Sequence, residues 1–409
     1  MIGLSYNQKS FDLEIDLPAS KSIYNRILIL NAIYQMNLRI KNPSNSGDSV
    51  LLESLLHSEN EILNCENAGT VLRFLTAYFV VGKKERILTG SERMLERPIA
   101  QLVDSLTQIG ADIKYTKKVG FPPIKISSSD LKGGIIQING EVSSQFISAL
   151  AMIGPKLTES LTIHIEGKIS SKPYIEMTVK LMQKLGFDID FTGNIIAVGS
   201  WNGACNLIEI EIEPDWSAVS FWFQMIANSQ NASVIFKKLS SKSLQGDSIL
   251  GKWAKRLGIE LTNNENGILI KKSNLPNEEN TSWNLADYPD LAPSLIVLLS
   301  SFKQKAYFTG LESPKIKESN RILALQTELK KCQVELKEVK EHWELDATHF
   351  KLTEGTVFEN YNDHRIAMAF ASLAFLAPIR MNKPESVNKS YPDFWNHLKQ
   401  AGICIENDS

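Results

Sequence analysis

The chain is poor in the features that define several large classes of protein. Its 409 residues include only four cysteines, Cys65, Cys205, Cys332 and Cys404, and no two of them form a CxxC pair. This argues against a disulfide framework and a thiolate metal site, so we interpret them as reduced thiols of a cytoplasmic protein. The six histidines show neither HExxH nor paired-ligand spacing, and we predict no metal and no cofactor.

Long apolar runs and a strong net charge are also missing. The longest apolar stretches, Leu291–Phe302 and Ile366–Ile379, are shorter than the roughly 20 residues of a membrane-spanning helix, so we predict two buried helices. Met1 to Asp12 lacks the basic start and apolar run of a secretory signal. Lysine and arginine number 44 against 46 aspartates and glutamates, which argues against a surface that coats nucleic acid.

What the chain does contain is an internal repeat. Amphipathic segments end in Leu-Gly or a similar pair, and a short strand-like segment follows at Gly110, Gly186, Gly258 and Gly402. A degenerate copy has Cys332 at the glycine position. Glycine suits a helix C-terminus, where the chain turns with positive φ. The spacing of 70 to 76 residues predicts an α/β chain of about six units.

A second feature is a set of loops rich in small residues that precede apolar helical segments and carry a cation. Free N–H groups and the helix dipole attract anions there, and a cation is disfavoured unless an anion offsets it. We therefore predict a site for a small ligand with more than one anionic group. The cations in or near these first turns are Lys21, Arg73, Lys172, Arg321, Arg365 and Lys389, and Arg97 before a proline joins them.

Two carboxylates suit acid–base chemistry. Asp290 lies directly before an apolar helical segment, and Glu318 lies between Lys317 and Arg321. Charges this close in sequence tune the pKa values of their neighbours, as catalytic groups require. The sequence lacks a GxxxxGK[ST] phosphate loop and a GxGxxG after a strand.

Together these segments resemble the 5-enolpyruvylshikimate-3-phosphate synthase family of enolpyruvyl transferases, in order and over nearly the whole chain. The matching motifs are Pro-Ala-Ser-Lys-Ser-x-x-Asn-Arg (18–26), Asn-Ala-Gly-Thr-x-x-Arg (67–73), Leu-Thr-Gly…Glu-Arg-Pro-Ile (88–99), Val-Ser-Ser-Gln-Phe (142–146), Ser-Lys-Pro-Tyr-Ile (171–175), Pro-Asp (289–290), Lys-Glu-x-x-Arg (317–321), Asn-Asp-His-Arg-x-Ala-Met (362–368) and Lys-Ser-Tyr-Pro-Asp (389–393).

The resemblance implies an α/β fold of two pseudo-symmetric domains. Each has three βαβαββ units of the inside-out α/β barrel type, and the active site lies in the interdomain cleft. Weak breaks at Pro18 to Ser20 and Glu213 to Asp215 fall at the implied crossings. The implied domains are a discontinuous one, 1–19 plus 215–409, with Asp290, Glu318, Arg321, Arg365 and Lys389, and an inserted one, 20–214, with Lys21, Arg97, Ser143, Ser144, Gln145 and Ser171.

The implied reaction moves the enolpyruvyl group of phosphoenolpyruvate to the 5-hydroxyl of shikimate 3-phosphate and releases phosphate through a tetrahedral intermediate. It belongs to the shikimate pathway to chorismate and the aromatic amino acids. We expect a monomer without nucleic-acid or membrane partners, and a target of glyphosate, for which Gly69 leaves space.

Site residues are carried over by position. Asp290 would accept the 5-hydroxyl proton, Glu318 would donate a proton to the methylene carbon, and Lys21 would assist. The residues implied for shikimate 3-phosphate are Lys21, Ser22, Arg26, Ser143, Ser144, Ser171, Asp290, Ser313 and Lys317. The residues implied for phosphoenolpyruvate are Lys21, Gly69, Arg97, Gln145, Arg321, Arg365 and Lys389.

The sequence departs from the family at three places, and rival interpretations exist. Ser313 stands where asparagine is usual, Gly-Asp-Asp becomes Gly-Asp-Ser at 47–49, and Phe74 stands where many members have proline. A related transferase that acts on UDP-N-acetylglucosamine has a reactive cysteine before its Arg-Pro, and the loop Gly90–Pro98 has none. Two more rivals are a non-catalytic anion-binding relative and a nucleic-acid-binding repeat protein.

Overall fold

The computed structural model describes residues 1–8, 10–82, 84–141, 143–201, 203, 207–273 and 281–407. Val142 of the fourth motif and Cys205 lie outside the described residues. By contacts between residues, the chain divides into two compact units. Unit 1 comprises Met1–Ala19 and Glu213–Ser409, and unit 2 comprises Ser20–Ile212.

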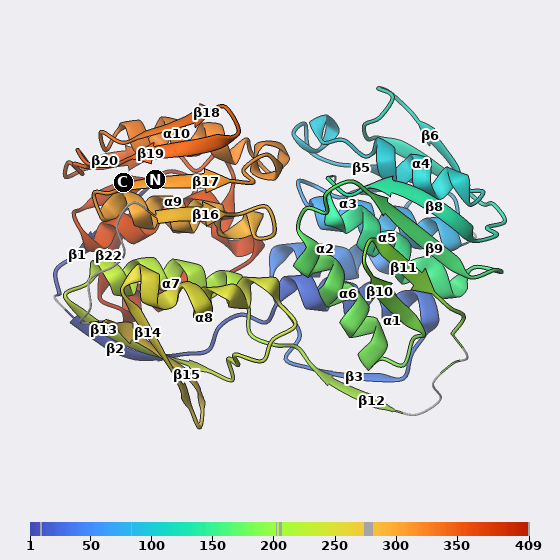
Figure 1. Ribbon diagram of the computed structural model, residues 1–409, viewed down its shortest axis with the longest axis horizontal. Coiled ribbons are helices and arrows are strands. Elements are labelled where there is room, and N and C mark those ends of the chain that lie inside the picture. Colours follow the sequence, from blue (N-terminus) through green and yellow to red (C-terminus); the bar gives the residue numbers. More distant parts are fainter. Residues whose placement is uncertain are drawn as a thin grey trace. The chain divides into compact units, whose positions relative to one another are not determined.

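One strand order recurs through the molecule (Figure 1). In the sheet β4-β5-β7-β6, the first two strands are parallel and the other neighbours antiparallel. A helix crosses between the parallel strands and a hairpin joins the last two, which is the expected βαβαββ unit. The sheet β8-β9-β11-β10 repeats it. These unit 2 strands are β4 (Ile62–Asn64), β5 (Arg86–Thr89), β6 (Asp112–Tyr115), β7 (Ile124–Ser127), β8 (Gly134–Asn139), β9 (Leu161–Glu166), β10 (Ile189–Thr192) and β11 (Ile195–Val198).

Unit 1 contains three sheets with this order. Two of them borrow a strand from the start of the chain, because β2 pairs with β13 and β1 lies between β21 and β22. The strands are β1 (Ile2–Tyr6), β2 (Ser10–Ile15), β13 (Asn231–Lys237), β14 (Ile259–Asn264), β15 (Gly267–Lys272), β16 (Thr281–Asn284), β17 (Lys305–Thr309), β18 (Glu335–Val339), β19 (His342–Asp346), β20 (Thr356–Phe358), β21 (Ile379–Met381) and β22 (Ile403–Asn407). The repeated α/β fold is confirmed. Among the described residues, however, the sixth sheet has just two parallel strands, β3 (Leu38–Lys41) and β12 (Ile208–Glu211).

The helices that fill each unit are buried on nearly all sides. In unit 1 these are α7 (Trp216–Asn228), α9 (Ala292–Ser301) and α11 (His364–Ala371), and in unit 2 α1 (Lys21–Tyr34), α3 (Gly69–Val81) and α5 (Ser144–Ile153). A helix that is apolar all round belongs in a core, which explains why sheets flank helices here. The remaining α-helices are α2 (Gly47–Leu56), α4 (Ala100–Gln108), α6 (Lys172–Lys184), α8 (Leu250–Trp253), α10 (Arg321–Lys330) and α12 (Phe394–Gln400).

Both long apolar stretches are buried over most of their length, as predicted, with Leu376 of the second one exposed. The first forms α9, and the second forms α11 and the short 3-10 helix η7 (Ser372–Phe375) before it enters β21. No helix in the described ranges combines the length and the apolar character that crossing a bilayer needs.

The repeat glycines have the backbone that their position requires, but the alignment of the fifth copy on Cys332 is wrong by one residue. Gly110 and Gly186 have φ of 102° and 87°, whereas Cys332 is not among the positive-φ residues and Gln333 is, at 59°. The Gln333 and Val334 N–H groups bond back to Lys330 and Leu329, as in the other copies. Gln333 therefore occupies the glycine position, and the buried Cys332 replaces the apolar residue that precedes the glycine in the other copies.

Candidate active site

In unit 2, Lys21 is the first residue of α1 and pairs with a carboxylate of α2. Its Nζ lies 2.9 Å from Asp48 Oδ2, and the two side chains are 13% and 7% exposed. The positive charge of Lys21 at this helix start is thus offset by the Asp48 carboxylate. A substrate anion can compete with Asp48 for the Lys21 ammonium. Sequence reasoning assigned no role to Asp48, although it lies in one of the departures from the family pattern.

Arg26, also on α1, is buried and links α1 to α5 and α6 through hydrogen bonds. It donates Nε–H to Thr178 Oγ1 at 2.6 Å and Nη2–H to Ser148 Oγ at 3.2 Å, and it bonds two backbone carbonyls. The Phe74 ring packs 5.4 Å from its guanidinium carbon. Burial lowers the pKa of Arg26 to about 10. Most N–H groups of Arg26 already donate hydrogen bonds within unit 2. Arg26 therefore has fewer N–H groups left to bind a ligand than the family motif implies.

Two further guanidinium groups converge on the start of α3, and we call Gly69, Arg73, Arg97 and Gln145 the α3 cluster. Gln145 Oε1 accepts from Arg73 Nη1 at 2.6 Å, while its Nε2 donates to Thr70 Oγ1. A Cβ at Gly69 would lie 2.4 Å from Arg97 Nη2 and 2.8 Å from Arg73 Nη1. Both arginines are buried, so this helix start concentrates positive charge where water is scarce.

The predicted serines of unit 2 lie at helix starts. Ser143 caps α5 by accepting from the Gln145 N–H, and Ser144 is the first residue of that helix. Ser171 precedes α6 with the left-handed φ of 56°. Ser22 offers its carbonyl oxygen to Arg26 Nη1.

In unit 1, Arg321 joins three carboxylates, and we call Asp290, Glu318, Arg321, Asp363 and Arg365 the Asp290 cluster. Arg321 begins α10 and is 1% exposed. Its Nε lies 2.8 Å from Asp363 Oδ2, its Nη1 3.1 Å from Asp290 Oδ1 and its Nη2 2.8 Å from Glu318 Oε2. The planar guanidinium can serve all three because its N–H groups diverge in a fixed fork.

Asp290 in turn lies close to three cations, Lys317, Arg321 and Arg365. Arg365 Nη2 lies 2.8 Å from its Oδ2, and Lys317 Nζ lies 3.9 Å from its Oδ1. Burial alone would raise the pKa of Asp290, but Arg365, Lys317 and Arg321 outweigh it and hold that pKa well below its usual range. Asp290 is therefore a carboxylate here, and a weak base while these cations face it.

Lys389 reaches the same cluster from a helix end. Its Nζ lies 3.5 Å from Glu318 Oε1, but Lys389 is the last residue of the 3-10 helix η8 (Pro384–Lys389), so the predicted helix start at this residue is wrong. Ser313 opens another short 3-10 helix, η6 (Ser313–Ile316).

Sequence reasoning assigned no role to Asp363, whose position in the Asn-Asp-His-Arg motif was a usable signal. Asp363 is fully buried, caps α11 by accepting from the Arg365 N–H, and accepts from Arg321 with its other oxygen. One aspartate thus holds the backbone of Arg365 and the guanidinium of Arg321. Asp247 and Thr178 were missed without any such signal. Cys65 is fully buried and burial raises its pKa above the usual range, which agrees with an inert thiol.

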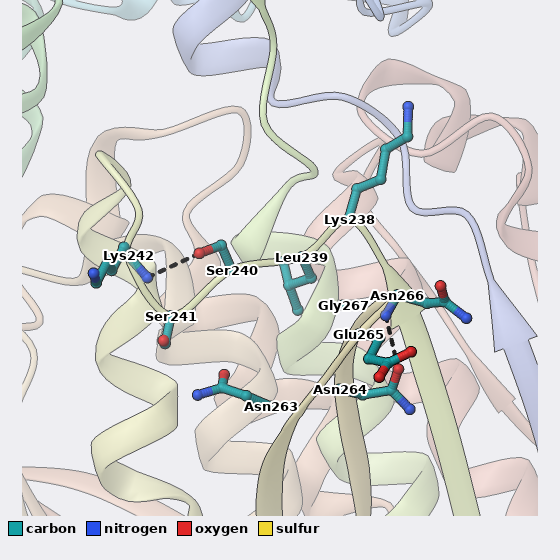
Figure 2. A pocket seen from close by; sticks show the side chains of 10 residues that line it. All are labelled: Lys238, Leu239, Ser240, Ser241, Lys242, Asn263, Asn264, Glu265, Asn266 and Gly267. Carbon is teal, nitrogen blue, oxygen red and sulfur yellow. Dashed lines mark hydrogen bonds between the residues drawn. The ribbon is translucent and has the colours of Figure 1, made fainter.

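A surface hollow of about 600 Å³ lies elsewhere in unit 1, against the β14–β15 hairpin (Figure 2). It is lined by residues 238–242 and 263–267, none of which is a predicted site residue. Ser240 and Asn264 bond to backbone N–H groups of their own turns. The hollow is therefore a feature of two turns and separate from the predicted catalytic groups.

Comparison with known proteins identifies the family. The family described as EPSP synthase (3-phosphoshikimate 1-carboxyvinyltransferase) matches residues 49–398. A 3-phosphoshikimate 1-carboxyvinyltransferase of Bacteroides fragilis is 40% identical over 397 residues, 96% of each chain. One from a Shewanella species is 31% identical over 94% of this chain and 96% of its own.

Solved structures agree in fold. EPSP synthase from Acinetobacter baumannii superposes with a TM-score of 0.78 at 19% identity over 99% of both chains. The enolpyruvyl transferase NikO from Streptomyces tendae has a TM-score of 0.76 at 13% identity, over 99% of this chain and 98% of its own. The chain belongs to the EPSP synthase (3-phosphoshikimate 1-carboxyvinyltransferase) family, and its activity is that of this transferase of the shikimate pathway.

Proposed function

We propose that the α3 cluster, the Lys21–Asp48 pair and the Asp290 cluster act on one pair of substrates, phosphoenolpyruvate and shikimate 3-phosphate. The observation that carries this proposal is the Asp290 cluster, where Asp290 and Glu318 share the buried Arg321 and Asp290 also pairs with the buried Arg365. Both substrates are anions that repel each other, so buried cations are needed to bring them together. The placement of ligands in a cleft between two domains stays a prediction from the resemblance.

Asp290 is the proposed base for the 5-hydroxyl of shikimate 3-phosphate. The cations that hold its pKa low, Arg365, Lys317 and Arg321, are the ones assigned to substrate phosphate and carboxylate groups. When a substrate anion engages these cations, their pull on Asp290 weakens and its carboxylate becomes a stronger base. Substrate binding would thereby switch on the group that must accept the proton.

Glu318 is the proposed acid at the methylene carbon. Its two oxygens face different cations, Oε2 the Arg321 Nη2 and Oε1 the Lys389 Nζ. The 5-hydroxyl oxygen bonds to C2 of phosphoenolpyruvate as its proton passes to Asp290, and C3 takes a proton from Glu318. Elimination then passes a proton from C3 to the Glu318 carboxylate and breaks the C2–O bond to phosphate, which restores the C2–C3 double bond and releases phosphate. Lys21 would assist, because its ammonium can leave Asp48 for the leaving phosphate.

The remaining residues bind the substrates in this proposal. Ser22, Arg26, Ser143, Ser144, Ser171, Ser313 and Lys317 take shikimate 3-phosphate, and Gly69, Arg97, Gln145, Arg321, Arg365 and Lys389 take phosphoenolpyruvate. A monomer in the cytoplasm and sensitivity to glyphosate complete the proposal. The absence of a Cβ at Gly69 supports the last, because it lets the buried Arg97 guanidinium lie against the backbone at this helix start.

The direct experiment mixes the purified protein with both substrates in metal-free buffer and measures phosphate. We expect release that needs both substrates, and no release from folded protein would refute the proposal. Titration of each substrate, followed by calorimetry, separates the rival function: tight binding without turnover would favour a non-catalytic anion-binding relative.

A further inference from the structure

Asp247 is a buried carboxylate near the Asp290 cluster that no step of the proposed mechanism uses. It lies in the 3-10 helix η3 (Gly246–Ile249) and is 3% exposed. Ser217 donates its hydroxyl hydrogen to Asp247 Oδ2 over 2.5 Å. A carboxylate this buried is costly unless it is hydrogen-bonded or paired, so its neighbours must account for it.

Ser217 connects Asp247 to Arg365. It is the second residue of α7, and its backbone N–H bonds to the helix cap Asp215 at 2.9 Å. Arg365 Nη2 lies 3.5 Å from Ser217 Oγ and 2.8 Å from Asp290 Oδ2. A guanidinium has no acceptor atom, so Arg365 must donate to Ser217, and the single hydroxyl hydrogen then goes to Asp247. The direction of both hydrogen bonds is therefore fixed.

We propose that Asp247 and Ser217 form a positioning pair that holds the Arg365 guanidinium in place for phosphoenolpyruvate. The inference rests on the proposed function, in which Arg365 binds phosphoenolpyruvate and Asp290 takes up a proton. When Asp290 takes up a proton, its attraction for the Arg365 guanidinium weakens. The Asp247 carboxylate still interacts with the same nitrogen, Nη2, through the Ser217 hydroxyl. Arg365 then keeps its orientation through the step at which the charge of its other partner changes.

The charge state of Asp247 supports this role. Burial and the neighbouring Asp290 carboxylate raise the pKa of Asp247 to about 6, against the opposing effects of Arg365 and of the Ser217 hydrogen bond. At pH 8 the group is still ionised, and an ionised acceptor makes the stronger hydrogen bond.

The kinetic test uses the full chain at pH 8 with Ser217→Ala, Ser217→Thr, Asp247→Asn and the Ser217→Ala/Asp247→Asn double variant. We expect Ser217→Ala to raise the KM for phosphoenolpyruvate about tenfold and the KM for shikimate 3-phosphate less than about twofold. Ser217→Thr, which keeps the hydroxyl, should restore the first KM. The double variant should be no worse than the worse single variant, because both changes break one chain of hydrogen bonds.

The matched control is the serine–aspartate pair on the exposed sheet face, where Ser233 bonds Asp12. Ser233→Ala and Asp12→Asn should leave both KM values unchanged. An unchanged KM for phosphoenolpyruvate in Ser217→Ala, or an equal rise in both KM values, would overturn the positioning role. Ser217→Ala removes one oxygen atom, so it decides the question even if Asp247→Asn does not fold.

A crystal structure of Ser217→Ala without substrates tests the same role independently of turnover. We expect the Arg365 guanidinium to leave hydrogen-bond distance of Asp290 Oδ2, and an unmoved guanidinium would refute the proposal. Absence of phosphate release from the unchanged protein would instead refute the proposed function, whatever the position of Arg365.

Discussion

Arg321 donates its Nε–H to Asp363 over 2.8 Å, and the two side chains are 1% and 0% exposed. The same Asp363 caps α11, so this ion pair ties the start of α10 to the start of α11. The bond is buried and charge-assisted, and its loss would leave Asp363 without the cation that offsets its burial.

Replacing Arg321 by alanine should therefore destabilise the protein as well as weaken the binding of phosphoenolpyruvate. We expect Arg321→Ala to lower the free energy of unfolding by about 3–5 kcal/mol, as for other broken buried pairs. Urea unfolding measures the change. The control is Arg39→Ala, because Arg39 is 63% exposed and pairs with Glu209, so its loss should cost under about 1 kcal/mol. Equal losses in the two variants would contradict the structural role of Arg321.

Glu318→Gln should separate turnover from binding. The glutamine keeps the size of the side chain and an acceptor oxygen for Arg321, but it cannot donate the proton that the methylene carbon needs. We expect kcat to fall by about 10²–10⁴, with the Kd for shikimate 3-phosphate changed less than about threefold. Stopped-flow or coupled phosphate assays and calorimetry measure the two quantities.

Glu338→Gln is the matched control for Glu318, since Glu338 pairs with Lys315 at a more exposed position. Its kcat should be that of the unchanged protein. Unchanged turnover in Glu318→Gln would remove Glu318 from the mechanism, whereas loss of binding together with turnover would mark it as a structural group.

Gly69→Ala should act selectively on phosphoenolpyruvate. The new Cβ would lie 2.4 Å from Arg97 Nη2 and 2.8 Å from Arg73 Nη1, so both guanidinium groups must move. We expect the KM for phosphoenolpyruvate to rise at least about tenfold while the KM for shikimate 3-phosphate stays within about twofold. Gly3→Ala is the control, because its Cβ would meet nothing closer than 3.9 Å. A rise confined to shikimate 3-phosphate would reassign the α3 cluster.

Asp247 should make stability depend on pH in a defined direction. Its pKa is raised from 3.8 to about 6, so between these values the folded protein holds a proton that the unfolded chain has released. The stabilising effect is complete below about pH 4 and is lost as the pH rises through about 6, a total of about 3 kcal/mol. Asp247→Asn does not titrate, so its stability relative to the unchanged protein should improve between pH 4.5 and pH 7.

Urea unfolding at several pH values checks this prediction. The control is Asp346→Asn, because hydrogen bonds from Thr348 lower the pKa of Asp346 to about 2. The stability that Asp346 contributes is present above its ordinary pKa and is lost only below about pH 4, so its variant should run parallel to the unchanged protein from pH 4.5 to pH 7. A parallel profile for Asp247→Asn as well would show that Asp247 is not titrating in this range.

Gln333→Gly should stabilise the protein slightly, whereas Cys332→Gly should destabilise it. Gln333 has a φ of 59°, which costs a residue with a Cβ about 1–2 kcal/mol, partly offset by the extra freedom of glycine in the unfolded chain. Cys332 is fully buried, and its removal leaves a cavity. Thermal unfolding compares the two variants. The opposite order would restore Cys332 as the glycine position of the repeat.

The sequence predicted the residue types of the site better than their partners. Lys21, Arg321 and Asp290 could be proposed as site residues because a charge beside a helix start is a local pattern. Their counterions could not, since Asp48 lies 27 positions from Lys21 and Asp363 lies 42 positions from Arg321. Such contacts depend on which helices pack together, and no spacing in the chain encodes that.

Local backbone geometry limited the fold prediction in the same way. A glycine after a helix predicts a positive φ, and the four repeat glycines have one. A glutamine does not predict a positive φ, so the left-handed conformation of Gln333 could not be expected from the sequence. Without a glycine to mark it, the turn position is predicted one residue early, at Cys332, although Val-Glu-Leu after Gln333 matches the residues that follow the glycine in the other copies. No local sequence pattern marks Asp247, because its proposed role depends on a hydrogen bond from Ser217, which lies 30 positions away in the chain.

The pairing of β1 with β22 has a consequence for biosynthesis. Ile2 lies opposite Asn407 and Tyr6 opposite Ile403, so this sheet cannot be completed until nearly the whole chain has left the ribosome (Figure 1). At about 5–20 residues per second, the first strand waits tens of seconds for its neighbour. Residues 20–212 are contiguous and emerge in between, so unit 2 can fold during translation while unit 1 is still waiting for its last strands. A nascent chain stalled near residue 250 should thus already protect unit 2 from proteolysis and leave β1 accessible.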